Sequence, residues 1–141
     1  MNDRHKLKVL FLCTGNSCRS QMAEGWARHL KSDCIEAFSA GVNPHGVNER
    51  AVAIMAEAGV DISGHTSNHL DEYANLDFDY VITVCDNAKE HCPLYPKQTT
   101  MIHRMFEDPS FVIGTDEQIT AEFRRVRDEI RDFIAAMPDN L

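Results

Sequence analysis

The chain has 141 residues, of which 43% are hydrophobic and 26% charged, as expected for one globular domain spanning residues 1–141. The 22 acidic and 14 basic residues give a formal net charge of −8 without any basic run, so we expect no nucleic-acid partner. The longest apolar run, Val9–Cys13, is too short to span a bilayer, and no signal peptide precedes it. We therefore expect a cytoplasmic protein without membrane contact.

The first predicted elements are a strand and a helix. The apolar run Lys8–Leu12 enters a cluster of Gly, Ser and Asn residues, which indicates a buried strand followed by a loop. From Ser20 the pattern becomes helical, and the predicted inward face carries Met22, Trp26 and Leu30.

The middle of the chain repeats this alternation. Ile35–Ser39 predicts a second strand and Glu49–Ala58 a second helix, and Asp61–Leu70 reads as a polar connection. Tyr80–Val84, rich in β-branched residues, predicts a third strand, and Thr100–His103 predicts a fourth with a weaker pattern.

The last predicted helix has the clearest start. Thr115 and Gln118 form a capping-box pattern, and apolar residues then recur at helical spacing. This stripe is expected to face the core, and it comprises Ile119, Phe123, Val126, Ile130 and Phe133.

Strands that alternate with helices in one small chain predict an α/β fold with an open parallel sheet. Ligands of such sheets bind at the carboxyl ends of the strands, where Cys13 follows the first strand and Cys85 the third. The chain has five cysteines, an odd number that cannot form a closed disulfide framework.

The loop Cys13–Ser20 joins the first strand to the first helix, so its backbone N–H groups and the helix dipole can bind an anion. Gly15 removes a Cβ where the backbone must approach a ligand, and Arg19 offers a planar set of donors to a tetrahedral oxyanion. Cys13 lies in the same positive field, which favours its thiolate, and Ser20 can donate a hydrogen bond to it.

Residues Val9–Ser20 resemble the phosphate-binding loop of low-molecular-weight protein tyrosine phosphatases, and more closely that of the arsenate reductases built on the same fold. The resemblance covers nearly the whole chain, in the segments Cys13–Trp26, Ser39–Gly41, His45–Gly46, Asp61–Ser63, Glu107–Pro109 and Val126–Ile130. It implies a small three-layer α/β domain with a four-stranded parallel sheet flanked by helices. It also implies an oxyanion-binding loop made of Thr14, Gly15, Asn16, Ser17, Cys18, Arg19 and Ser20.

Similarity to the thioredoxin-coupled reductases implies a relay of three cysteines. Cys13 attacks arsenate to form a covalent adduct, and Cys85 then attacks Cys13, which releases arsenite. Cys92 next attacks Cys85 and leaves a Cys85–Cys92 disulfide for reduced thioredoxin, so no tightly bound cofactor is expected. Two alternatives for the second pair are a structural zinc site, which the six-residue spacing does not suit, and two inert thiols.

The resemblance makes Asp108 the general acid that protonates a departing oxygen, whereas without it an Asp before Pro reads as a turn former. Glu107 next to it reads as a solvated charge. The relay does not use Cys18 or Cys34, which we interpret as structural thiols.

Some of these reductases bind potassium, at positions that correspond here to Asn16, Glu24, Ser39 and Thr66. Asn68 stands where the potassium-binding members have an acidic ligand, which argues against potassium, and we expect no metal. Several histidines read as loop or surface residues without ligand spacing, namely His45, His65, His69, His91 and His103.

Arsenate is thus the expected substrate, with phosphate or sulfate as analogues, and thioredoxin the expected partner of a monomer. The second hypothesis is a tyrosine phosphatase that uses Cys13, Arg19 and Asp108. Pro109 and Ser110 follow the acid, so no aromatic residue that could grip a phosphotyrosine ring is evident there. A third hypothesis is a sensing module that only binds oxyanions or responds to redox state.

Overall fold

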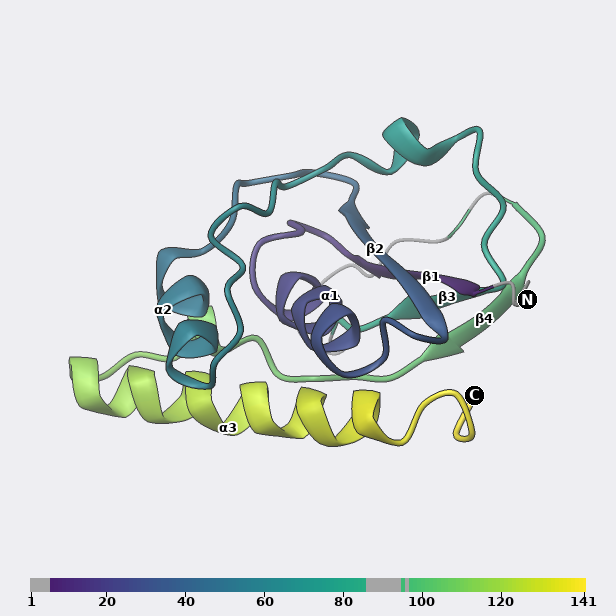
Figure 1. Ribbon diagram of the computed structural model, residues 1–141. Coiled ribbons are helices and arrows are strands. Elements are labelled where there is room, and N and C mark those ends of the chain that lie inside the picture. Colours follow the sequence, from purple (N-terminus) through teal and green to yellow (C-terminus); the bar gives the residue numbers. More distant parts are fainter. Residues whose placement is uncertain (1–5, 86–94, 96) are drawn as a thin grey trace.

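The computed structural model describes residues 6–85, 95 and 97–141 (Figure 1). Its centre is a four-stranded sheet in the order β2-β1-β3-β4, in which every neighbouring pair is parallel. The strands are β1 (Leu7–Cys13), β2 (Ile35–Gly41), β3 (Tyr80–Thr83) and β4 (Thr100–His103). The predicted α/β fold with a four-stranded parallel sheet is confirmed.

Three α-helices and two short 3-10 helices complete the described elements. They are α1 (Arg19–Leu30), α2 (Glu49–Glu57), η1 (Leu70–Tyr73), η2 (Pro109–Phe111) and α3 (Asp116–Ala135). The four predicted strands and three predicted α-helices all exist, with boundaries that differ by at most two residues. The two 3-10 helices were not predicted.

The two faces of β1 look into different clusters of apolar side chains. Val9 and Phe11 face the larger cluster, to which all three α-helices contribute. Leu10 and Leu12 face a smaller one on the opposite side, which the segment carrying η1 covers. All four side chains are fully buried, as expected for a central strand of a parallel sheet.

The helix α3 lies along α1 and α2 and closes the larger cluster (Figure 1). Its predicted capping box is present, since Gln118 N–H donates to Thr115 Oγ1 at 3.1 Å and the Gln118 side chain accepts from Thr115 N–H at 2.8 Å. Of the predicted stripe, Phe123, Val126 and Ile130 are buried, and the remaining two residues pack partly buried against them.

The predicted inward face of α1 is correct for Met22 and Trp26 and wrong for Leu30. Leu30 is 38% exposed because it is the last residue of the helix, where the chain turns toward β2. No helix in the described part of the chain is both long and apolar enough to cross a bilayer.

The register of the strands brings the two predicted reactive cysteines to one edge of the sheet, where the carboxyl ends of the strands lie. Cys13 pairs with Gly41 of β2, and Leu12 pairs with Thr83 of β3. The chain leaving β3 therefore reaches Cys85 beside the end of β1, as the sequence predicted.

Candidate active site

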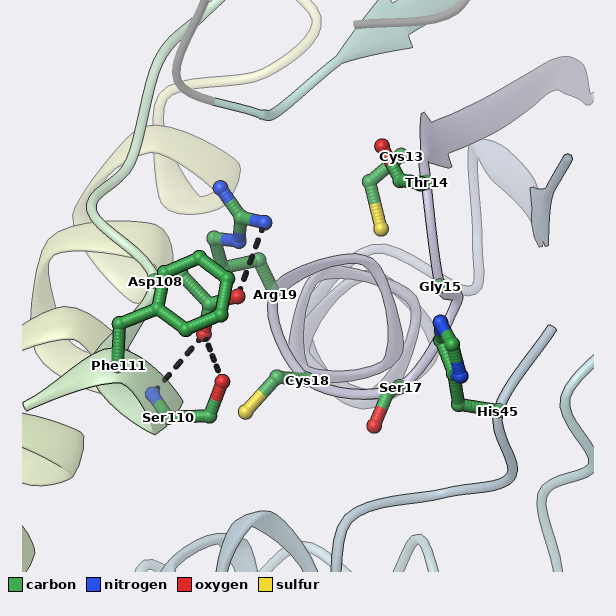
Figure 2. Close-up of a pocket in the computed structure, with 10 residues that line it drawn as sticks. All are labelled: Cys13, Thr14, Gly15, Ser17, Cys18, Arg19, His45, Asp108, Ser110 and Phe111. Atoms are coloured by element: carbon green, nitrogen blue, oxygen red, sulfur yellow. Dashed lines mark hydrogen bonds and ion pairs between the residues drawn. The ribbon is translucent and has the colours of Figure 1, made fainter. Parts of the chain in front are cut away.

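A pocket opens at this edge, between the β1–α1 loop and the segment that precedes α3 (Figure 2). Its lining comprises Cys13, Thr14, Gly15, Ser17, Cys18, Arg19, His45, Asp108, Ser110 and Phe111. The structure thus brings together Cys13, most of the predicted oxyanion loop, Arg19 and Asp108. The N-terminus of α1 lies in the same loop, and none of the described side chains caps it.

The carbonyl oxygens of this loop point away from the pocket. Those of Thr14 and Ser17 accept hydrogen bonds from the N–H groups of Asn43 and Asn48, at 2.9 and 3.0 Å. The Asn16 carbonyl accepts from two side chains on its outer side. Because C=O and N–H of a trans peptide point in opposite directions, the N–H groups that follow these carbonyls turn inward. The loop can therefore bind an oxyanion through its backbone.

Two residues allow the tight path of the loop. Asn16, with φ of 46°, has the left-handed conformation, which Asn tolerates better than most other residues. A Cβ at Gly15 would lie 2.6 Å from Cδ2 of His45, so a larger residue there would displace the imidazole. The imidazole packs directly against the glycine.

Cys13 takes part in a chain of buried polar groups. Its Sγ lies 3.1 Å from Oγ of Ser20, and Nδ2 of Asn16 donates to the same oxygen at 2.9 Å. The N–H of Asn68 donates to Oδ1 of Asn16 at 2.7 Å, which fixes the orientation of that amide. All of Asn16 and Ser20 is buried, so the hydroxyl is held against the sulfur.

Arg19 and Asp108 meet on the wall of the pocket. Nη2 of Arg19 lies 3.3 Å from Oδ2 of Asp108, and Nη1 donates to the Phe106 carbonyl at 3.1 Å. The other carboxylate oxygen, Oδ1, accepts from N–H and Oγ of Ser110, at 2.9 and 2.6 Å. The predicted acid therefore lies at the pocket with both oxygens oriented.

The other thiols differ in their surroundings. Cys18 is buried in the pocket wall, and burial, with a further contribution from the Asp108 charge, raises the pKa of its thiol well above the usual range. Cys34 is partly buried; desolvation and the Asp33 charge raise the pKa of its thiol. Both stay protonated at neutral pH, in keeping with structural roles.

Cys13, Cys18 and Cys34 are free, whereas Cys85 is fully buried and disulfide-bonded. Cys85 belongs to the same apolar cluster as Cys13. Cys92, the third cysteine of the predicted relay, lies outside the described residues, as does His91.

The positions associated with potassium are bonded to one another. Glu24 accepts a hydrogen bond from Ser39 at 2.5 Å and forms an ion pair with Arg28 at 2.7 Å, and Oδ1 of Asn68 accepts from the Thr66 hydroxyl at 2.9 Å. Each of these groups therefore has a protein partner in this structure. Among the described residues, no cluster of His, Cys, Asp and Glu could hold a metal ion.

Sequence reasoning missed three neighbours of the predicted site. Phe111 lines the pocket, so the inference that no aromatic residue accompanies Asp108 is wrong. Phe111 is the last residue of η2, three positions after the acid. His45, interpreted as a loop or surface residue, does lie in a loop with its surface exposed, and it also lines the pocket. Glu107, interpreted as a solvated charge, is 51% exposed as expected, and it also forms an ion pair with Arg125 at 3.0 Å.

Three other histidines that were interpreted as loop or surface residues, His65, His69 and His103, lie in the described part of the chain. His65 Nδ1 lies 3.0 Å from the Gln21 side chain, and its partial burial lowers the pKa of the ring. His69 caps η1, and His103 contacts the Thr83 hydroxyl at 2.7 Å from the exposed edge of the sheet.

The family model of low molecular weight phosphotyrosine protein phosphatases matches residues 8–140. The chain belongs to this family. The expected resemblance is therefore confirmed, and the pocket occupies the edge of the sheet where the family motif lies.

Several similar proteins are arsenate reductases, and a low molecular weight protein tyrosine phosphatase from T. tengcongensis is 25% identical, with a TM-score of 0.77 over 96% of this chain and 100% of that one. The arsenate reductase of Halalkalibacterium halodurans is 48% identical over 126 residues, which cover 89% of this chain and 91% of that protein. A solved arsenate reductase in the phosphate binding state is 34% identical, with a TM-score of 0.76 over 95% of this chain and 98% of that one. A thioredoxin-dependent arsenate reductase of Corynebacterium glutamicum is 26% identical, with a TM-score of 0.67 over 99% of this chain and 66% of that one.

Proposed function

We propose that this chain reduces arsenate to arsenite and that Cys13 is its nucleophile. The observation that carries the proposal is the placement of two cysteines in different states. Free Cys13 lies at the oxyanion pocket, and disulfide-bonded Cys85 follows the neighbouring strand in the same buried cluster. Phosphate-ester hydrolysis has no use for the second cysteine, whereas reduction needs a resolving thiol.

In the first step the Cys13 thiolate attacks arsenic, and an S–As bond replaces an As–O bond. The loop N–H groups and Arg19 hold the other oxygens. An oxyanion at Arg19 competes with Asp108 for the guanidinium, and we assign to the Asp108 carboxyl the proton that this step needs. Asp108 then gives that proton to the leaving oxygen, which departs as water.

In the second step Cys85 attacks Sγ of Cys13, and the electron pair of the S–As bond remains on arsenic, which leaves as arsenite. Cys92 then attacks Cys85 and frees the Cys13 thiolate. The remaining disulfide accepts two electrons from a dithiol, which we assign to thioredoxin; the thioredoxin-dependent relative supports this choice. We place the reaction in the cytoplasm, because a reducing compartment regenerates that donor.

The test is a coupled assay with arsenate, thioredoxin, thioredoxin reductase and NADPH. We expect steady NADPH loss with the wild-type protein and none with Cys13→Ser, Cys85→Ser or Cys92→Ser. Cys92→Ser is expected to release about one arsenite per enzyme, because Cys85 can resolve the adduct once. Full turnover by Cys92→Ser would contradict the relay.

Phe111 supports a second candidate function. Its ring lines the pocket and is 62% exposed, so an aromatic phosphate ester could pack against it while Cys13 attacks phosphorus. Hydrolysis of such an ester that Cys85→Ser leaves unchanged, with no arsenite formed from arsenate, would favour the phosphatase.

A further inference from the structure

An aromatic contact and an ionic contact help to hold the segment that carries Asp108 against α3. Phe106 is buried, and its ring centroid lies 6.0 Å from that of Phe133 in α3, with the Arg104 guanidinium 4.5 Å from the Phe106 ring. The second attachment is the ion pair between Arg125 of α3 and Glu107. Because Glu107 and Asp108 are adjacent, this second contact acts one residue from the acid.

Arg125 holds more than one carboxylate. Its guanidinium lies 3.0 Å from Glu107, 2.7 Å from Glu122 and 2.7 Å from Glu129. One exposed ion pair contributes little to stability, so the strength of a single bond does not decide the role of Arg125. The local balance of charge decides this role. Without Arg125, the carboxylates of Glu107, Glu122 and Glu129 lose a cation that they share, and the two glutamates of α3 repel Glu107.

We propose that Arg125 is a positioning residue, which holds Glu107 against α3 and so fixes Asp108 on the wall of the pocket beside Arg19. The proposal rests on the proposed function, in which Asp108 is the general acid. The acid lies 3.3 Å from Arg19, and small displacements of a catalytic group have large effects on rate. Release of Glu107 therefore moves the proton donor away from the leaving oxygen.

The same helix offers a matched control. The side chain of Arg124 is 49% exposed, against 39% for Arg125, and it donates two hydrogen bonds of 2.8 Å to Glu57 of α2. Replacing Arg124 thus removes a comparable contact of α3 without touching the segment that carries Asp108.

The experiment measures arsenite release in a single turnover, from pH 5 to pH 9, by reduced wild type, Arg125→Ala, Arg124→Ala and Asp108→Asn. We expect Arg125→Ala to be slower by about 10-fold, a part of the effect of a lost general acid. Arg124→Ala is expected to keep the wild-type rate. Arg125→Lys, which restores the charge with fewer donors, is expected to lie between the two arginine-to-alanine outcomes.

Two double variants separate positioning of the acid from a general role in folding. In the Asp108→Asn background, Arg125→Ala is expected to cause no further loss, because both changes remove the same proton transfer. In the Arg125→Ala background, Glu107→Gln is expected to restore much of the rate, because it removes the repelled charge. A purely structural role of Arg125 gives additive losses in the first pair and no rescue in the second.

Equal rates for Arg125→Ala and Arg124→Ala, or additive losses with Asp108→Asn, would overturn the proposal. A wild-type protein that releases no arsenite contradicts the proposed function instead, whatever the variants do. If Asp108→Asn keeps the wild-type rate, the acid is not used, and the role of Arg125 is overturned with it.

Discussion

At the scale of single residues, the position of one hydroxyl hydrogen bears on the reactivity of Cys13. Ser20 has one hydrogen to donate, and its oxygen already accepts from Asn16 at 2.9 Å. An ionised Cys13 has no hydrogen to give, so the Ser20 hydroxyl is then the donor to Cys13 Sγ, 3.1 Å away. A hydrogen bond to a thiolate stabilises the charged form over the thiol. Asn16 therefore acts on the nucleophile through Ser20.

We predict that Ser20→Ala slows alkylation of Cys13 by iodoacetamide at pH 7 by about 10-fold, since a hydrogen bond to a charged group is worth about 1.5–3 kcal/mol. Mass spectrometry of the peptide carrying Cys13 measures the rate at that thiol alone. Ser63→Ala deletes a hydroxyl that bonds only to Asp61 at the surface, and it is expected to leave the rate unchanged. Equal rates in the two variants would show that the hydroxyl does not support the thiolate.

The residues with reactive side chains could be identified from the sequence, because Cys13, Arg19 and Asp108 belong to short, recognisable segments. The residues that surround them could not. His45 contacts Gly15, which precedes it by 30 positions in the sequence. Arg125 contacts Glu107, and η2 lies between these two residues in the sequence. Such contacts depend on the tertiary path of the loops. The sequence around His45 or Arg125 is the same whether the side chain contacts the site or is solvated, so it does not predict these contacts.

At the scale of elements, the end of β2 supports the oxyanion loop. A Cβ at Gly41 would overlap the Thr14 carbonyl oxygen and lie 2.9 Å from the Asn16 nitrogen. Both contacts are backbone, which cannot move aside without changing the loop. Gly41 therefore allows the strand and the loop to approach closely.

Gly41→Ala is accordingly expected to weaken the binding of sulfate or phosphate by at least about 10-fold, because a loop displaced by a few tenths of an ångström no longer presents its N–H groups together. Isothermal titration calorimetry with each anion measures the change. Gly64→Ala is the control, since a Cβ at Gly64 meets no atom within 4 Å. Unchanged affinity in Gly41→Ala would show that the loop adapts to the added methyl group.

Periodicity clearly predicted the elements that bury a face, and it indicated the less buried elements only weakly or not at all. The apolar stripe of α3 and the apolar run of β1 predicted where these two elements lie to within two residues, because their side chains fill the core. β4 has a weaker pattern because three of its four residues are exposed at the edge of the sheet. The 3-10 helices are too short for any period to repeat, so only turn chemistry, such as Asp108 before Pro109, could indicate η2.

At the scale of the whole molecule, the net charge of −8 repels an anionic substrate at long range, so affinity must come from donors within the pocket. Arginines of α3 form hydrogen bonds with acidic side chains at the surface. Glu57 accepts hydrogen bonds from Arg124 at 2.8 Å and from Arg127 at 3.1 Å, which join α2 to α3. These bonds lower the pKa of the Glu57 carboxyl to about 2.

The sign of the pH dependence follows from this shift. The folded state holds the pKa of Glu57 below its ordinary value of 4.5, so the ionised carboxylate stabilises the fold above about pH 4.5. This stabilisation is lost as the pH falls from 4.5 toward 2. We predict that Glu57→Gln has a lower urea midpoint than the wild type at pH 7, and that the difference narrows over this window. Glu36→Gln, an exposed change on β2, is expected to show no such narrowing. A difference for Glu57→Gln that is as large at pH 2.5 as at pH 7 would mean that packing, and not the charge of Glu57, joins the two helices.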